Sequence, residues 1–160
     1  MARQAGFRGA IADATGERDP IVIPGDYSES SGADAARLLI AGRLSVDAIF
    51  CANDMMAIGV CGVLADAGIA IGDEVGVAGF DDIPIAHYAA PSLTTMNARI
   101  AELGATAAEK LIALMAGGDG DIGATILSPQ LVERDSTRRT ASQPPRTEQL
   151  IREIQQGNPS

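Results

Sequence analysis

The chain has 160 residues, of which 46% are hydrophobic and 21% are charged, and its formal net charge is −9 at pH 7. This length suits one domain with a sizeable core, and the composition is that of an ordinary soluble globular protein. The acidic balance argues against nucleic-acid binding by this chain on its own, because phosphate contacts need clustered Lys and Arg. A parent protein could still bind DNA through another module.

The cysteines and the hydropathy pattern indicate the cellular location that we expect for the protein. Cys51 and Cys61 fit neither a CxxC motif nor a zinc pattern, so we expect two reduced thiols, which suits a cytoplasmic location. Asp54, Asp66 and Asp73 interrupt the apolar runs, and none approaches the ~20 residues of a membrane span. The N-terminal Met-Ala-Arg-Gln lacks the profile of a secretory signal.

Apolar patterning divides the chain into alternating helices and strands. It predicts helices over residues 3–14, about 30–41, 54–67, within 81–88 and over 99–116, and strands over 21–23, 48–51, 75–79, 93–96, 125–127 and 130–133. Ser28 or Ser30 can cap the second helix. No strand precedes the first helix, although an α/β fold normally supplies one, so we expect the chain to be the C-terminal part of something longer.

Residues 46–91 are the centre of this pattern, because they predict a strand, a helix and a second strand. The first strand ends at Asn53 and Asp54, and the second ends at Asp81 and Asp82. In an open parallel sheet, ligands bind beyond the carboxyl ends of the strands. We therefore expect Asn53, Asp54 and Asp81 on the rim of a small-molecule cleft.

The helix between these two strands begins with polar residues and is otherwise apolar. Asn53 can cap it, with Asp54 beside the partial positive charge of the helix end. Met55 and Met56 are expected in the core. Gly59 is expected, together with Gly62, to permit close contact between the helix and the sheet.

The composition changes near the C-terminus. Residues 138–160 contain Pro and Arg in a Ser/Thr/Gln background, which predicts a polar tail, with a short helix possible over 149–156. The basic run over 134–146 could touch phosphate, but a solvated tail is the favoured interpretation.

Six segments, in this order and spacing, resemble the effector-binding part of lactose-repressor (LacI/GalR-type) transcription regulators. The match covers residues 3–137, and the segments read ARQAGFRGA, GDYSESSGADAA, DAIFCANDMMAIG, DEVGVAGFDDIPIAHYAAPSLTTM, ELGATAAEKLIALMAG and LVERDST.

The resemblance implies an α/β fold like that of type I periplasmic sugar-binding proteins, in which two lobes joined by three crossover strands clamp a sugar or nucleobase. Residues 3–88 would form most of the C-terminal lobe, and 93–96 would cross to the other lobe. Residues 99–116 would be a helix of that lobe, and 130–137 would cross back. The helix-turn-helix, the hinge helix, the first strand of the C-terminal lobe and most of the N-terminal lobe are absent from this sequence. We therefore expect an incomplete effector domain over residues 1–137, followed by the tail.

The resemblance also implies a ligand-binding set. Arg3, in the family's RxxGF motif, would hydrogen-bond the effector through its planar fork of donors. Tyr27 would stack on the effector, and Asn53, Asp54 and Asp81 would bind paired hydroxyls. Each has a purely structural alternative: a frayed first turn for Arg3, an exposed loop aromatic for Tyr27, helix capping for Asn53 and Asp81, and dipole complementarity for Asp54.

Asp82 and His87 are weaker candidates for contact with a ligand. Asp82 is expected to cap a helix or turn outward. His87, the only histidine, could contact the ligand or lie on an exposed helix face. With one histidine and no metal-ligand cluster, neither a catalytic site nor a bound metal or cofactor is expected.

The favoured function is therefore the effector-sensing portion of a homodimeric transcription regulator, which reads DNA through a module outside this chain. A sugar-binding protein of an import system shares the fold and stays open. A flavodoxin-like enzyme, using Asp54 and Asp81 with a metal, is a weaker alternative. The isolated chain is expected to associate, because Leu103, Leu111 and Leu114 would face a mostly missing lobe.

Overall fold

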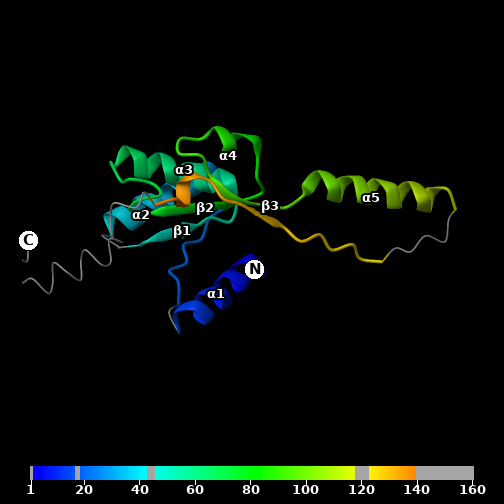
Figure 1. The fold of residues 1–160 in the computed structure, drawn as a ribbon, viewed down its shortest axis with the longest axis horizontal. Helices are drawn as coiled ribbons and strands as arrows, with labels where there is room; N and C mark the ends of the chain where they lie inside the picture. Colours follow the sequence, from blue (N-terminus) through cyan, green and yellow to red (C-terminus); the bar gives the residue numbers. More distant parts are fainter. Residues whose placement is uncertain (1, 17–18, 43–45, 118–122, 140–160) are drawn as a thin grey trace, which may run out of the picture.

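The computed structural model describes residues 2–16, 19–42, 46–117 and 123–139 (Figure 1). In chain order its elements are α1 (Ala2–Thr15), α2 (Glu29–Ala41), β1 (Ala48–Phe50), α3 (Asp54–Asp66), β2 (Gly76–Phe80), α4 (Pro84–Tyr88), β3 (Thr94–Asn97), α5 (Ile100–Met115), β4 (Gln130–Val132) and a 3-10 turn, η1 (Asp135–Thr137). The predicted tail covers residues 138–160, and its part after Arg139 lies outside the described residues. Within the described ranges, no helix combines the length and the apolar character needed to cross a membrane.

A four-stranded sheet in the order β1-β2-β3-β4 forms the centre of the molecule. Strands β1, β2 and β3 are parallel, with Ile49 opposite Val77, and β4 runs antiparallel to β3, with Met96 opposite Leu131. Helix α3 connects β1 to β2, and α4 connects β2 to β3. The predicted α/β class is confirmed, and all three parallel strands end at the same edge of the sheet.

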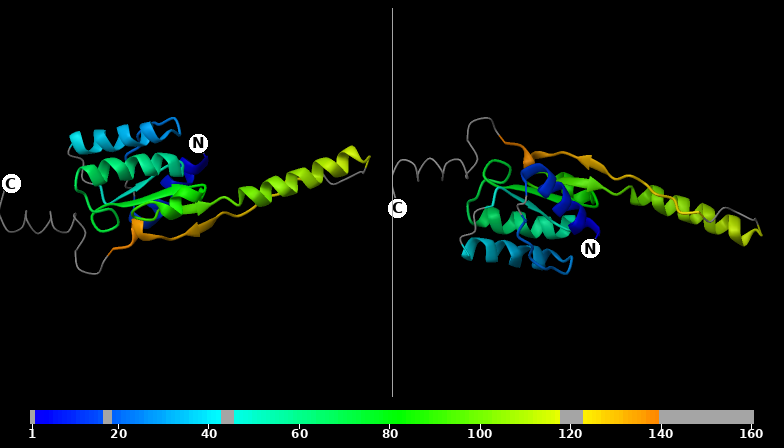
Figure 2. Two further views of the ribbon diagram at one scale, coloured as in Figure 1. Left: turned by 90° about the horizontal axis from the view of Figure 1, so that it is seen from above. Right: turned by 90° about the horizontal axis from the view of Figure 1, so that it is seen from below.

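Helices α2 and α3 lie on one face of the sheet, with α3 as the inner layer (Figure 2). Because α3 packs against both α2 and the sheet, it is apolar nearly all round. The core cluster contains Ala36, Cys51, Met56, Ala57, Val60, Leu64, Val75, Val77, Ala86 and Leu93. This packing fixes the N-terminus of α3 at the edge where the parallel strands end.

Two glycines let α2 and α3 approach closely. A Cβ on Gly59 would lie 2.0 Å from the carbonyl oxygen of Glu29, and a Cβ on Gly32 would lie 2.1 Å from that of Met56. A Cβ on Gly62, by contrast, would meet nothing within 4 Å. The prediction that Gly59 and Gly62 contact the sheet is wrong: Gly59 contacts the neighbouring helix, and Gly62 faces open space.

Helices α1 and α5 lie outside this packed layer. Below β1 in Figure 1, α1 contacts the sheet through Phe7, whose ring stacks on that of Phe50 at 5.2 Å between centroids. Helix α5 projects away from the sheet, with β3 leading to it and β4 returning from it (Figures 1 and 2). None of its residues is buried, which confirms the expected exposure of Leu103, Leu111 and Leu114.

Three local predictions are wrong. Residues 21–23 and 125–127 form no strand, because neither segment pairs with a strand in the described part of the chain. Met55 is 38% exposed whereas Met56 is buried. Successive residues of a helix point in different directions, so only one of the two can face the core.

Candidate functional site

Four of the predicted ligand residues gather where β1 and β2 end. Asn53 follows β1 and Asp81 follows β2, while Arg3 comes from α1 and Tyr27 from the loop before α2. We call the group of Arg3, Tyr27, Asn53 and Asp81 the strand-end site. Its members come from segments up to 78 residues apart in sequence, counted from Arg3 to Asp81.

Asn53 has a capping role and also holds the loop that carries Tyr27. Its Oδ1 accepts a hydrogen bond from the Met56 amide at 3.0 Å, which caps α3 as predicted. Its Nδ2 donates to the carbonyl oxygen of Tyr27 at 3.0 Å. An amide nitrogen carries two hydrogens, so one remains for a ligand.

The turn before α2 presents Tyr27 to solvent. Tyr27 has a left-handed backbone (φ 70°) and is 53% exposed. Asp26 accepts hydrogen bonds from the Ser28 side chain and backbone amide at 2.5 and 2.9 Å, and these bonds lower the pKa of Asp26 to about 2. Ser28 in turn caps α2 by accepting from Ser31. The turn is therefore built by side chains that bond to its own backbone.

Arg3 joins α1 to the ends of both strands. Its guanidinium donates to the carbonyl oxygen of Ala52, and lies 4.5 Å from the ring centroid of Phe80 and 5.9 Å from that of Tyr27. Contacts of this kind between a cation and an aromatic face are attractive. Sequence reasoning missed Phe80, although an aromatic residue directly before the Asp81-Asp82 pair was a usable signal.

Asp81 has the backbone of a constrained loop residue. Its φ is 116°, a conformation that non-glycine residues rarely adopt, and its amide donates to the carbonyl oxygen of Met96 at 2.9 Å. In the part of the chain that the structure describes, its carboxylate is not hydrogen-bonded to any group and forms no ion pair. It is thus free to accept hydrogen bonds from a guest.

The sequence predicted Asp54 on the rim of a cleft. The structure instead buries it, with 0% of the residue exposed. Its carboxylate accepts from the Thr95 hydroxyl at 2.5 Å and from the Ile83 amide at 2.9 Å. Burial raises the pKa of Asp54, the negative charges of Asp81 and Asp82 add to that rise, and the two hydrogen bonds oppose it. Asp54 thus holds the loop after β2 from behind.

Asp82 also differs from its prediction. It neither caps a helix nor turns outward, but forms an ion pair with Arg134 at 2.7 Å and accepts a hydrogen bond from Asn97 at 2.9 Å. Both partners are distant in sequence, so no local pattern indicated them.

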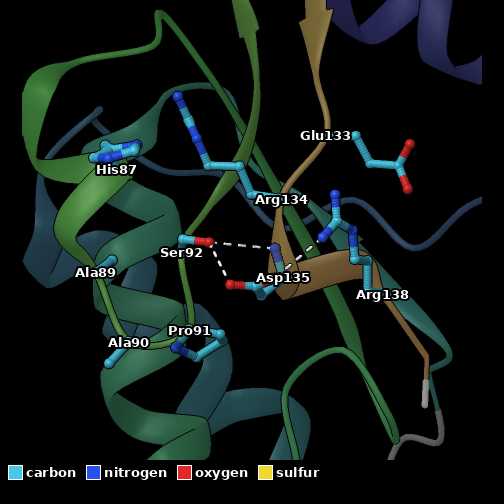
Figure 3. A pocket seen from close by; sticks show the side chains of 9 residues that line it. All are labelled: His87, Ala89, Ala90, Pro91, Ser92, Glu133, Arg134, Asp135 and Arg138. Atoms are coloured by element: carbon cyan, nitrogen blue, oxygen red, sulfur yellow. Dashed lines mark hydrogen bonds and ion pairs between the residues drawn. The ribbon is translucent and has the colours of Figure 1, made fainter.

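His87 lies apart from the strand-end site. It lines an open hollow of about 610 Å³ beside η1, shown in Figure 3, together with residues 89–92, 133–135 and 138. Polar contacts cross this hollow, including the 2.7 Å bond from the Ser92 hydroxyl to Asp135. None of the five predicted ligand residues lines it.

The fold and the family model define the class of this protein. Residues 1–137 match the family described as "Periplasmic binding protein-like domain". The chain belongs to this family. It corresponds to part of the effector domain of LacI/GalR-type regulators.

Particular relatives support this placement. The transcriptional regulator GalR of Escherichia coli (strain K12) is 35% identical over 135 residues, which cover 84% of this chain and 39% of GalR. The complex of the transcriptional regulator CelR with cellobiose is 32% identical with a TM-score of 0.77, over 84% of this chain and 41% of CelR. The Lac repressor dimer bound to operator and the anti-inducer ONPF is 27% identical with a TM-score of 0.73, over 85% of this chain and 41% of that chain.

The chain therefore spans about two fifths of the length of the curated relatives that it matches. These relatives are named as transcription regulators and not as enzymes, which agrees with the expectation of a non-catalytic binding domain.

Proposed function

We propose that this chain is the effector-binding portion of a LacI/GalR-type transcription regulator and binds a sugar at the strand-end site. The observation that carries the proposal is the convergence of Arg3, Tyr27, Asn53 and Asp81 at one edge of the sheet. The set combines an aromatic ring, a guanidinium, an amide and a carboxylate, which are the groups that bind the CH face and the hydroxyls of a sugar.

Asp54 supports this site without touching the ligand. Because it is buried and its two oxygens are occupied by Thr95 and Ile83, its role is to hold the loop that carries Asp81. We therefore assign it to positioning, and keep the other four residues as ligand contacts.

The regulator as a whole is proposed to act as a homodimer in the cytoplasm and to read DNA through a module outside this chain. Support comes from the similarity to the Lac repressor dimer bound to its operator. Ligand binding would shift the population of conformations that present the DNA modules, since a ligand moves an equilibrium by its differential affinity for the two states.

Thermal unfolding in the presence of cellobiose, other mono- and disaccharides and purine bases tests the proposal. A ligand at 100 times its Kd stabilises the folded state by about 2.7 kcal/mol, so the unfolding temperature rises measurably. Asp81→Asn and Tyr27→Ala should each weaken binding about 10- to 100-fold, the loss expected when a charged hydrogen bond or a stacking contact is removed.

Asp34→Asn provides the matched control, because Asp34 is an exposed carboxylate on α2 whose bonded partner is Arg37. It should leave the affinity unchanged. The proposal fails if no member of the panel stabilises a folded sample. It also fails if the Asp81→Asn and Tyr27→Ala variants bind the ligand as tightly as the unmodified chain.

A further inference from the structure

Asp81 and Asp82 are neighbours in sequence, but only Asp82 is tied to other elements through its side chain. One carboxylate oxygen accepts from Arg134 at 2.7 Å, and the other accepts from Asn97 at 2.9 Å. The side chains of Asp82 and Arg134 are only 16% and 14% exposed, so water screens this ion pair far less than a surface pair.

The partners of Asp82 lie on the two segments that connect the sheet to α5, Asn97 in β3 and Arg134 in the segment directly after β4. Asn97 ends β3, and its Oδ1 accepts from the amide of Arg99, the residue that precedes α5, at 2.7 Å. Arg134 follows β4 and also donates to the carbonyl oxygen of Leu93 at 2.8 Å. One carboxylate thus bonds to the outgoing strand β3 and to the returning segment just after β4.

Unusual backbone conformations occur at both ends of this network. Asp81, Asp82 and Arg99 have φ values of 116°, 56° and 54°, and with Tyr27 they are the non-glycine residues of positive φ in the described part of the chain. Such conformations persist only where surrounding contacts impose them, and they concentrate at functional sites. Here Asp82 bonds to Asn97 and Arg134 through its side chain, and Asn97 accepts from the amide of Arg99.

We propose that Asp82 is a positioning residue that couples the loop carrying Asp81 to β3, β4 and the start of α5. A displacement of Asp81 by a bound ligand is transmitted through the carboxylate of Asp82 to Asn97 and Arg134, and from Asn97 to the first residue before α5. The ligand role of Asp81 rests on the proposed function, whereas the link itself is a property of this chain without ligand.

Amide hydrogen exchange of the 160-residue chain, resolved to single residues by NMR, tests the link without any ligand. Asn97→Ala removes the acceptor of the Arg99 amide and one donor to Asp82. We expect exchange to accelerate about tenfold at Arg99 and also at Asp81, whose own acceptor, the carbonyl of Met96, is unchanged. Asp82→Asn should accelerate exchange at Arg99, because coupling between two sites is reciprocal.

A double variant separates coupling through Asp82 from a direct effect of Asn97 on its neighbours. In an Asp82→Asn background, Asn97→Ala should add nothing at the Asp81 amide. Glu102→Gln is the matched control, because it removes the ion pair with Arg99 at the same helix start but has no bond to Asp82. It should leave the Asp81 amide unchanged.

The buried Val60 amide in α3 reports overall unfolding. If Asp82→Asn accelerates exchange there as well, Arg134→Lys replaces it, since Lys keeps the charge but lacks the planar guanidinium that bonds to Asp82 and to the Leu93 carbonyl at the same time. The link is overturned if Asn97→Ala accelerates amide exchange at Arg99 but not at Asp81. It is also overturned if Asn97→Ala still accelerates exchange at Asp81 in the Asp82→Asn background. Coupled exchange in a chain that binds no member of the ligand panel would support the link and reject the proposed function.

Discussion

Asp54 connects helix α3 to the loop after β2 from a position that water does not reach. It lies in the first turn of α3, and both of its oxygens accept hydrogen bonds, from the Thr95 hydroxyl and the Ile83 amide. The adjacent Gly79 leaves the space for this arrangement, because a Cβ there would lie 2.2 Å from Oδ1 of Asp54. Removing the carboxylate leaves the buried Thr95 hydroxyl and the partly buried Ile83 amide without a partner, at a cost of about 1–3 kcal/mol for the buried donor and less for the other.

The raised pKa of Asp54 predicts a defined pH dependence. A folded-state pKa above the ordinary value of 3.8 means that the folded chain binds this proton more tightly than the unfolded chain. The associated stabilisation is fully present below about pH 3.8 and is lost as pH rises through the folded-state pKa. The free energy of unfolding of the wild type, minus that of Asp54→Asn, should therefore fall by at most about 1.4 kcal/mol per pH unit in that window and then level off.

Urea unfolding of both chains between pH 3 and pH 8 measures this difference. A difference that rises with pH would contradict the prediction, because that sign belongs to a carboxylate whose hydrogen bonds outweigh its burial.

At the scale of elements, helices α2 and α3 contact each other through glycine. Gly59 leaves no room for a Cβ, since the carbonyl oxygen of Glu29 would lie 2.0 Å away, whereas Gly62 in the same helix has no neighbour within 4 Å of that position. The same substitution to alanine can therefore be compared at two positions of one helix, the crowded Gly59 and the open Gly62.

We expect Gly59→Ala to destabilise the fold by about 1–3 kcal/mol or more, because α2 and α3 must move apart. Gly62→Ala should stabilise it by up to about 1 kcal/mol, through helix propensity alone. Thermal or urea unfolding distinguishes the two variants. Equal effects of the two substitutions would show that the close approach of α2 and α3 does not contribute to stability.

Helix ends and strands differ in how far local sequence predicts them. The cap of α3 by Asn53 was predicted correctly, and Ser28, which caps α2, was one of the two candidates predicted, because a cap is a contact between residues three apart. Residues 21–23 have strand-forming composition but no strand beside them in the described chain, and Ile21 and Val22 are exposed. A strand exists only where a neighbour pairs with it.

At the scale of the whole molecule, α5 presents apolar side chains that nothing in the described chain covers. Its exposed large residues are Ile100, Leu103, Leu111, Ile112, Leu114 and Met115. Contiguous apolar surface of this kind drives association. The chain should therefore elute from a size-exclusion column as a species larger than a monomer.

Replacing Leu111 and Met115 by Glu should shift the elution toward the monomer, because it removes two neighbouring apolar groups from one face of α5. Ala101→Glu with Ala108→Glu is the control, since it adds the same charge to the same helix and keeps the large apolar side chains. A compact monomer for the unmodified chain, or an equal shift with both pairs, would overturn this expectation.

The amino-acid sequence by itself determined the α/β class, the order of most helices and strands, the cap of α3, and the placement of Asn53 and Asp81 after two parallel strands. These features depend on periodicity and on contacts within a few residues. The tertiary structure alone decided that Asp54 is buried beneath the loop after β2, that Arg3 lies over the ring of Phe80, and that Asp82 pairs with Arg134. Those contacts join residues 29 to 77 positions apart, counted from Asp54 to Ile83 and from Arg3 to Phe80. No local pattern specifies them, because they exist only once the sheet has brought its strand ends together.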